Sequence, residues 1–227
     1  PTFKTLQTVA SLCNSSTFIV KDPLDENAKA IDLAYSITRP EFNLLGLDCT
    51  SDASEAGLAK CFELLRHLEE FRAANPLLFE IKFNSTNKWA LSIHKPENSD
   101  VNPHPVLFLK GAPERVLKMC KYIMIDGKQV PLDSNWEQQY TTAYETLGGM
   151  GERVLGFAVK EMKEHSLDYP FSAKPDPNFA MDDLTFAGLI SLIDPPREGV
   201  PEAVAKCKRA RIKVFMVTGD HPITAQA

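Results

Sequence analysis

A lysine and a glycine stand side by side at a predicted strand-to-helix turn. Lys110 and Gly111 close an apolar, strand-like run, and Pro113-Glu114 has the composition of a helix start. A cation next to a backbone position without a side chain, at the beginning of a helix, favours the approach of a flat or anionic ligand. Since any strand-to-helix turn can use Gly and Pro, these residues alone also fit a purely structural turn.

A second candidate is an aromatic residue beside a polar turn. Phe83 ends an alternating, strand-like run and is followed by the polar stretch Asn84 to Lys88. An accessible aromatic face can stack on a nucleic-acid base, an interaction worth about 1–3 kcal/mol. The alternative is a core phenylalanine that precedes a hairpin turn, and the residues alone leave it open.

The rest of the sequence lacks the standard phosphate-binding and metal-binding patterns. No P-loop pattern occurs, and the cluster Gly148, Gly149 and Gly151 lacks the spacing of a dinucleotide-binding loop. That cluster follows a predicted helix, so we interpret it as a helix-ending turn, next to Arg153. The five histidines lack the spacing of metal ligands, and we predict no metal site.

Composition narrows the class of protein. The 227 residues are 44% hydrophobic, which is enough for a real core, and the net charge of -5 argues against nucleic acid or anionic lipid as a partner. Five cysteines without a C-x-x-C pair fit reduced thiols. The longest apolar runs are far below the roughly 18 residues of a membrane span, and no signal peptide opens the chain, so we expect a soluble piece.

The candidate residues must be positioned by elements that the sequence pattern predicts. In the first part of the chain, helical spacing predicts a helix with Glu55 in its first turn, capped by Asp52 or Ser54. Strand-like runs separated by polar or Pro-rich turns follow, as in an antiparallel sheet. The predicted order is helix 3–13, strand 17–20, irregular 21–50, helix to about 72, and strands 77–83, 89–94 and 106–110.

The pattern changes towards the end of the chain, where strand, helix and strand alternate as in a parallel α/β unit. Asp133 or Ser134 is the predicted cap of a helix, and Asp126-Gly127 is a predicted hairpin turn. We place a domain boundary near residue 195. The predicted order is helix 113–120, strand 122–125, helix to about 147, strand 153–160, surface loop 161–184, strand 184–193, helix 197–210 and strand 212–217.

Six stretches together, in their order and spacing, resemble the P-type ATPases. Several phrases are similar to the sodium/potassium-ATPase and proton/potassium-ATPase α-subunit branch. The stretches are Asp52-Ala53-Ser54-Glu55, Phe83 to Lys88, Lys110 to Glu114, Gly151 to Phe157, Asp194-Pro195-Pro196-Arg197 and Met216 to Asp220. The resemblance covers nearly the whole chain.

The resemblance implies an α/β (α+β) fold with two domains. Residues 1–194 would form the nucleotide-binding domain, a twisted antiparallel sheet flanked by helices. Residues 195–227 would begin the phosphorylation domain, a parallel α/β domain of the haloacid-dehalogenase type. The implied boundary agrees with the change of pattern near residue 195.

The resemblance also implies residue roles. Phe83 would stack on adenine, Glu55 would accept from its amino side, Lys110 and Gly111 would line the base pocket, and Lys88 and Arg153 would reach towards the phosphates. Each role suits its side chain, since Glu accepts hydrogen bonds and the planar guanidinium of Arg pairs with phosphate oxygens. Ala90 and Ala158 depart from the pattern, because animal pumps usually carry Gln at the first position and often Cys at the second.

Thr218 and Asp220 would contribute to the phosphorylation site, near the phosphate and near the nucleotide and Mg²⁺ respectively. The Asp-Lys-Thr-Gly-Thr stretch with the phosphorylated aspartate and the later magnesium-binding stretch do not occur in these residues. We therefore expect binding of ATP without turnover and assign no catalytic residue.

The implied function is to hold adenine and deliver the γ-phosphate to the aspartate of the neighbouring domain, driving Na⁺/K⁺ or H⁺/K⁺ transport. The implied partners are ATP, Mg²⁺ in the intact pump, the other pump domains and, as an option, a β subunit. The implied location is the cytoplasmic face of the plasma membrane. An alternative is a regulatory or interaction module that no longer binds nucleotide, suggested by Ala90. A third hypothesis, a phosphatase suggested by Thr218-Gly219-Asp220, lacks its nucleophile.

Overall fold

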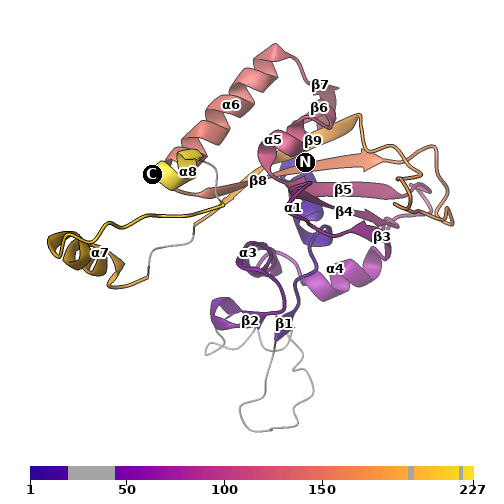
Figure 1. Cartoon of the computed structure of the whole chain (residues 1–227). Coiled ribbons are helices and arrows are strands. Elements are labelled where there is room, and N and C mark those ends of the chain that lie inside the picture. The colour runs from indigo at the N-terminus through magenta and orange to yellow at the C-terminus, as the bar shows by residue number, and fades with distance from the viewer. Residues whose placement is uncertain (20–43, 194–196, 220–221) are drawn as a thin grey trace, which may run out of the picture. The chain divides into compact units, whose positions relative to one another are not determined.

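A computed structural model describes residues 1–19, 44–193, 197–219 and 222–227 (Figure 1). The chain forms two compact units, one of residues 1–132 with 156–188 and the other of residues 133–155 with 189–227. Most of the predicted irregular stretch 21–50, the predicted turn Asp194-Pro195-Pro196 and Asp220 lie outside the described residues. None of the described helices is both long and apolar enough to cross a bilayer.

A seven-stranded sheet runs through the structure in the order β3-β4-β5-β8-β9-β6-β7. Its strands are β3 (Leu77–Ile81), β4 (Trp89–His94), β5 (Val106–Gly111), β6 (Cys120–Ile125), β7 (Lys128–Pro131), β8 (Arg153–Glu161) and β9 (Leu184–Leu192). The predicted α/β class with a sheet and flanking helices is confirmed. The sheet is mixed, however, because β6 and β9 pair in parallel. The 58 residues between them supply the long connection that a parallel pair requires.

Four of the helices that the structure describes belong to the first unit: α1 (Thr2–Leu12), α3 (Ala53–Glu63), α4 (Leu68–Ala74) and α5 (Pro113–Leu117). The same unit contains the short pair β1 (Phe18–Ile19) and β2 (Asp48–Cys49), and the 3-10 turn η1 (Leu44–Gly46). The single helix predicted up to residue 72 was wrong, because α3 ends at Glu63 and α4 starts at Leu68. The Glu63 carboxylate accepts a hydrogen bond from the Leu68 backbone N–H (2.8 Å), which caps the new helix.

Helix α1 packs on strand β4 through its last turn. The Cys13 thiol donates to the Ala90 carbonyl, and the Ser92 hydroxyl donates to the Leu12 carbonyl, both at 3.5 Å. Ala90 and Ser92 are alternate residues of β4 and therefore point to the same face of the sheet. This face of β4, together with α1, α3 and α4, surrounds the site described below.

The predicted surface loop 161–184 is anchored by aromatic side chains. Phe179 is buried and packs edge-on against Phe79 of β3, with ring centroids 5.6 Å apart. Phe171 lies 5.6 Å from Phe179 and 6.4 Å from Phe79. Three rings thus attach a segment without helix or strand to the sheet, and such contacts add about 0.5–1.5 kcal/mol per pair beyond burial.

The second unit contains α6 (Ser134–Gly149), α7 (Val200–Arg209) and α8 (Pro222–Gln226). Asp133 caps α6 by accepting from the Trp136 backbone N–H (3.0 Å), as predicted. The predicted strand 212–217 is wrong, because these residues are neither helix nor strand. A strand is held by hydrogen bonds to a neighbour, and no described strand pairs with this stretch, whose Phe215 and Val217 are 80% and 95% exposed.

Candidate functional site

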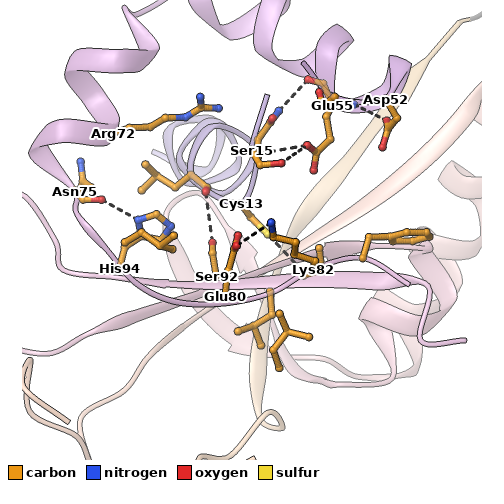
Figure 2. Close-up of a pocket in the computed structure, with 18 residues that line it drawn as sticks. Cys13, Ser15, Asp52, Glu55, Arg72, Asn75, Glu80, Lys82, Ser92 and His94 are labelled. Atoms are coloured by element: carbon orange, nitrogen blue, oxygen red, sulfur yellow. Dashed lines mark hydrogen bonds and ion pairs between the residues drawn. The ribbon is translucent and has the colours of Figure 1, made fainter. Parts of the chain in front are cut away.

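A cavity of about 430 Å³ opens between the end of α1, the start of α3, and strands β3 and β4 (Figure 2). Its volume is within the roughly 300–1,000 Å³ typical of small-molecule pockets. Two of the predicted site residues, Glu55 and Phe83, are among the residues that line it. Other lining residues that matter below are Ser15, Asp52, Arg72 and His94.

Helix α3 delivers Glu55 to the cavity because its start is fixed by Asp52. The Asp52 carboxylate accepts hydrogen bonds from the backbone N–H groups of Ser54 (2.8 Å) and Glu55 (3.0 Å). These are two of the N–H groups that the first turn of a helix cannot satisfy internally. Of the two predicted caps, Asp52 is the one observed.

Replacing Asp52 with Ala should lower the free energy of unfolding by about 1 kcal/mol, because both capping bonds are lost. Asp133→Ala, which removes the cap of α6, should destabilise the protein to a similar extent. Only the Asp52 variant should also weaken binding of a ligand in the cavity, since Asp52 orients the helix turn that carries Glu55. Urea denaturation and ligand titration of the two variants check both statements. Equal effects on ligand binding would contradict this role of Asp52.

The Glu55 carboxylate is bonded through both oxygens. Oε1 forms an ion pair with Nζ of Lys110, and Oε2 accepts from the hydroxyl (2.8 Å) and backbone N–H (3.3 Å) of Ser15. Only 8% of the Lys110 side chain and 16% of the Glu55 side chain are exposed. Since water is largely excluded, the attraction within this pair is stronger than that of a surface pair. The sequence placed both residues at a site but gave no indication that they contact each other.

Phe83 lies just beyond the end of β3, and 59% of its surface is exposed. The turn that follows is organised by Asn84, whose side-chain oxygen accepts from the backbone N–H groups of Thr86 (3.1 Å) and Asn87 (2.8 Å). The core alternative for Phe83 is wrong, because a core side chain would be buried. An exposed aromatic ring at the edge of a cavity is available to stack on a flat ligand.

Gly111 lies so close to the neighbouring strand that there is no room for a side chain. It pairs with Trp89 across β4 and β5, and a Cβ atom would collide with the Lys88 carbonyl and the Trp89 Cα. The Ala112 backbone N–H donates to the same Lys88 carbonyl (2.8 Å), which draws the two segments together. Neither Gly111 nor Lys110 is among the residues that line the cavity. Lys110 contacts the cavity lining through its ion pair with Glu55.

Several groups of the cavity lining also hold the fold together. His94 is buried, and its Nδ1 lies 2.8 Å from the Asn75 carbonyl. Because a carbonyl only accepts, Nδ1 carries the proton. Burial lowers the pKa of His94, so the ring is neutral at neutral pH. Burial also raises the pKa of the Cys13 thiol, which disfavours the reactive thiolate.

Arg72, on α4, lies over the end of α1 (Figure 2). Its Nε and Nη1 donate to the carbonyls of Ser11 (3.2 Å) and Ser16 (2.6 Å). Burial lowers the pKa of this guanidinium. Arg72 and Ser15 were not among the predicted site residues, since neither belongs to a recognisable motif. Their place at the cavity becomes visible only in the folded chain, where Ser15 contacts Glu55 and Arg72 contacts Ser11 and Ser16.

The other predicted residues lie outside the cavity lining. Lys88 is exposed and has a positive φ of 60° at the end of the polar turn. Arg153 begins β8 in the second unit, and Thr218 is exposed in the same unit. The structure places Glu55 and Phe83 in the lining of one cavity and brings Lys110 into contact with Glu55.

Comparisons with known proteins point in one direction. The family described as "P-type ATPase, cytoplasmic domain N" matches residues 2–199. The chain is 44% identical to the sodium/potassium-transporting ATPase subunit alpha-2 of Rattus norvegicus and of Homo sapiens, and 45% identical to the sodium/potassium-transporting ATPase subunit alpha of Drosophila melanogaster. These alignments cover 100% of this chain and 20–21% of the relatives. The chain thus spans about a fifth of the length of these relatives.

Proposed function

Since this chain belongs to the P-type ATPase family as a cytoplasmic domain N, we propose that it binds ATP in the cavity between Phe83 and Glu55. The observation that supports this best is the pairing of an exposed aromatic ring with a largely buried, fixed carboxylate at one cavity of suitable volume. The ring offers stacking, and the carboxylate offers an acceptor for an exocyclic amino group.

Each residue has a defined part in this proposal. Phe83 stacks on adenine, and Glu55 accepts from its amino group. Lys110 holds Glu55 in place. Gly111 lets the Lys88-Trp89 segment of the neighbouring strand pack closely against β5. Lys88, exposed beside Phe83, and Arg153 act on the phosphates, where Arg offers a planar fork and Lys a point charge.

In the longer protein, we propose, the domain positions ATP so that its γ-phosphate reaches an aspartate of a phosphorylation domain. Its contribution to catalysis is orientation of the nucleotide. We propose that residues 1–194 form the nucleotide-binding domain and that 195–227 begin the phosphorylation domain, to whose site Thr218 would contribute near the phosphate and Asp220 near the nucleotide and Mg²⁺. Bound Mg²⁺ would neutralise phosphate charge in the complete site.

The transport function of the relatives extends the proposal to the pump as a whole. Their names specify sodium/potassium transport, and we propose that the complete protein moves Na⁺ or H⁺ against K⁺ at the plasma membrane. This domain would then lie on the cytoplasmic face and work with the remaining pump domains and, where present, a β subunit.

A titration of the chain with ATP, ADP and AMP tests the binding proposal. We expect weak binding of all three with little dependence on Mg²⁺, because the base supplies most of the contacts. Isothermal calorimetry gives the affinities, and NMR shift changes identify the residues affected, with Phe83 and Glu55 among them.

The competing function is a regulatory or interaction module that has lost nucleotide binding. Ala90 favours it, because this lining residue offers no side-chain hydrogen bond where an amide is expected. If millimolar ATP leaves the NMR spectrum unchanged, this second function replaces the first.

A further inference from the structure

We propose that Ser15 is a positioning residue that sets the preference of the cavity for a 6-amino purine over a 6-oxo purine. The inference rests on the proposed binding of ATP in this cavity. Glu55 is the acceptor assigned to the adenine amino group, so the contacts that fix its carboxylate decide which base edge fits. Ser15 supplies two of those contacts.

Ser15 and Lys110 hold opposite oxygens of the same carboxylate. Ser15 donates to Oε2 from its hydroxyl at 2.8 Å and from its backbone N–H at 3.3 Å, while Lys110 pairs with Oε1. Figure 2 shows the Ser15 side chain facing Glu55 at the cavity. The carboxylate is therefore restrained on both sides and cannot rotate without breaking at least one charge-assisted hydrogen bond.

Ser15 is itself fixed by its neighbours. The Asn14 side chain donates to the Glu55 carbonyl (3.0 Å) and accepts from the Ser16 backbone N–H (2.8 Å). Arg72 donates to the Ser16 carbonyl at 2.6 Å. The turn that carries Ser15 is thus attached to α3 through Asn14 and to α4 through Arg72. A hydroxyl on such a turn has a defined position from which to direct Glu55.

The one acceptor site left on the Glu55 carboxylate determines the preference for a 6-amino over a 6-oxo purine. A carboxylate accepts at about four lone-pair sites, and the three donors of Ser15 and Lys110 occupy three. The fourth can take an amino hydrogen, whereas a 6-oxo group is itself an acceptor and is repelled. If the Ser15 hydroxyl is removed, the Glu55 carboxylate loses one of its donors and can turn, so a 6-oxo group no longer meets a fixed acceptor. Discrimination between the two bases should then fall.

The test compares the dissociation constants of ATP and inosine triphosphate for the wild-type chain and three variants. In Ser15→Ala, we expect the preference for ATP to fall by about fivefold, the equivalent of one lost hydrogen bond. Ser15→Thr keeps a hydroxyl and should keep the preference. Thr17→Val is the matched control, because it removes a nearby hydroxyl that pairs with the Thr50 hydroxyl at 3.0 Å, outside the cavity.

The outcomes separate this inference from the proposed function. If the wild-type chain binds neither nucleotide, the binding proposal itself fails. If it binds both equally, or if Ser15→Ala keeps the full preference for ATP, the positioning role is overturned. An equal loss of affinity for both nucleotides in Ser15→Ala would show a merely structural residue and would also overturn it. Urea denaturation of each variant establishes that it is folded before titration.

Discussion

The Lys110→Met variant should lose about 3 kcal/mol of unfolding free energy, because it leaves the Glu55 carboxylate largely buried without its cation. Methionine keeps the length and most of the volume of the lysine side chain, so the loss reports mainly the charge. Urea denaturation should show a lower midpoint with an unchanged slope, since the area exposed on unfolding stays the same. ATP binding should weaken as well, because Glu55 is released from its position.

A matched control comes from an exposed ion pair. Lys121 lies 3.6 Å from Asp183, and their side chains are 61% and 55% exposed. Lys121→Met should therefore cost no more than about 1 kcal/mol, as for other surface pairs. Equal losses in the two variants would contradict the importance of burial for the Lys110 pair.

A double-mutant cycle isolates the interaction between Glu55 and Lys110. Combining Glu55→Gln with Lys110→Met removes both charges, so the double variant should be clearly more stable than the sum of the two single losses predicts. Additive losses would mean that the two side chains act independently, contrary to the ion pair in the structure.

The Phe83→Ala variant should bind ATP about 5- to 150-fold more weakly, which corresponds to the roughly 1–3 kcal/mol lost when one stacking partner is removed. Its unfolding free energy should change little, because 59% of Phe83 is already exposed in the folded chain. Calorimetric titration measures the first effect and urea denaturation the second. A loss of ATP affinity without a loss of stability would identify Phe83 as a binding residue, whereas a core residue would lose stability.

Phe3 provides the control for this experiment. It is a phenylalanine of α1 with 58% exposure and does not line the cavity. Phe3→Ala should leave ATP affinity unchanged. Unchanged affinity in Phe83→Ala would refute stacking and would favour a module that does not hold adenine at this ring.

Several features could be predicted from sequence because they depend on residues close together in the chain. Asp133 was expected as a helix cap, and the capping bond is present. The hairpin turn Asp126-Gly127 has φ values of 49° and 77°, which fits the Asp-Gly preference for this turn. Phe83 was placed next to a polar turn, and that turn is held by the adjacent Asn84. Local hydrogen bonds and backbone preferences suffice for such features.

Other features depend on residues that are distant in sequence, and here prediction was incomplete. The break between α3 and α4 follows from the Glu63 side chain turning to cap Leu68, which helical periodicity does not reveal. The parallel pairing of β6 with β9 joins segments on either side of β7, α6 and β8. The predicted strand 212–217 shows the converse, since strand-like residues do not form a strand without a neighbour to pair with.

The sequence alone predicted the Phe83 turn and the Lys110-Gly111 turn as the centre of a site, through residue types, local pattern and resemblance. Only the tertiary structure revealed how that site is arranged. Glu55 is held by Lys110 from β5 and by Ser15 from the end of α1, residues 55 and 40 positions away. Position 111 requires glycine because the Lys88 carbonyl and Trp89 occupy the space that a Cβ atom would need. Such contacts arise from the packing of α1 and α3 against the sheet, which no local pattern encodes.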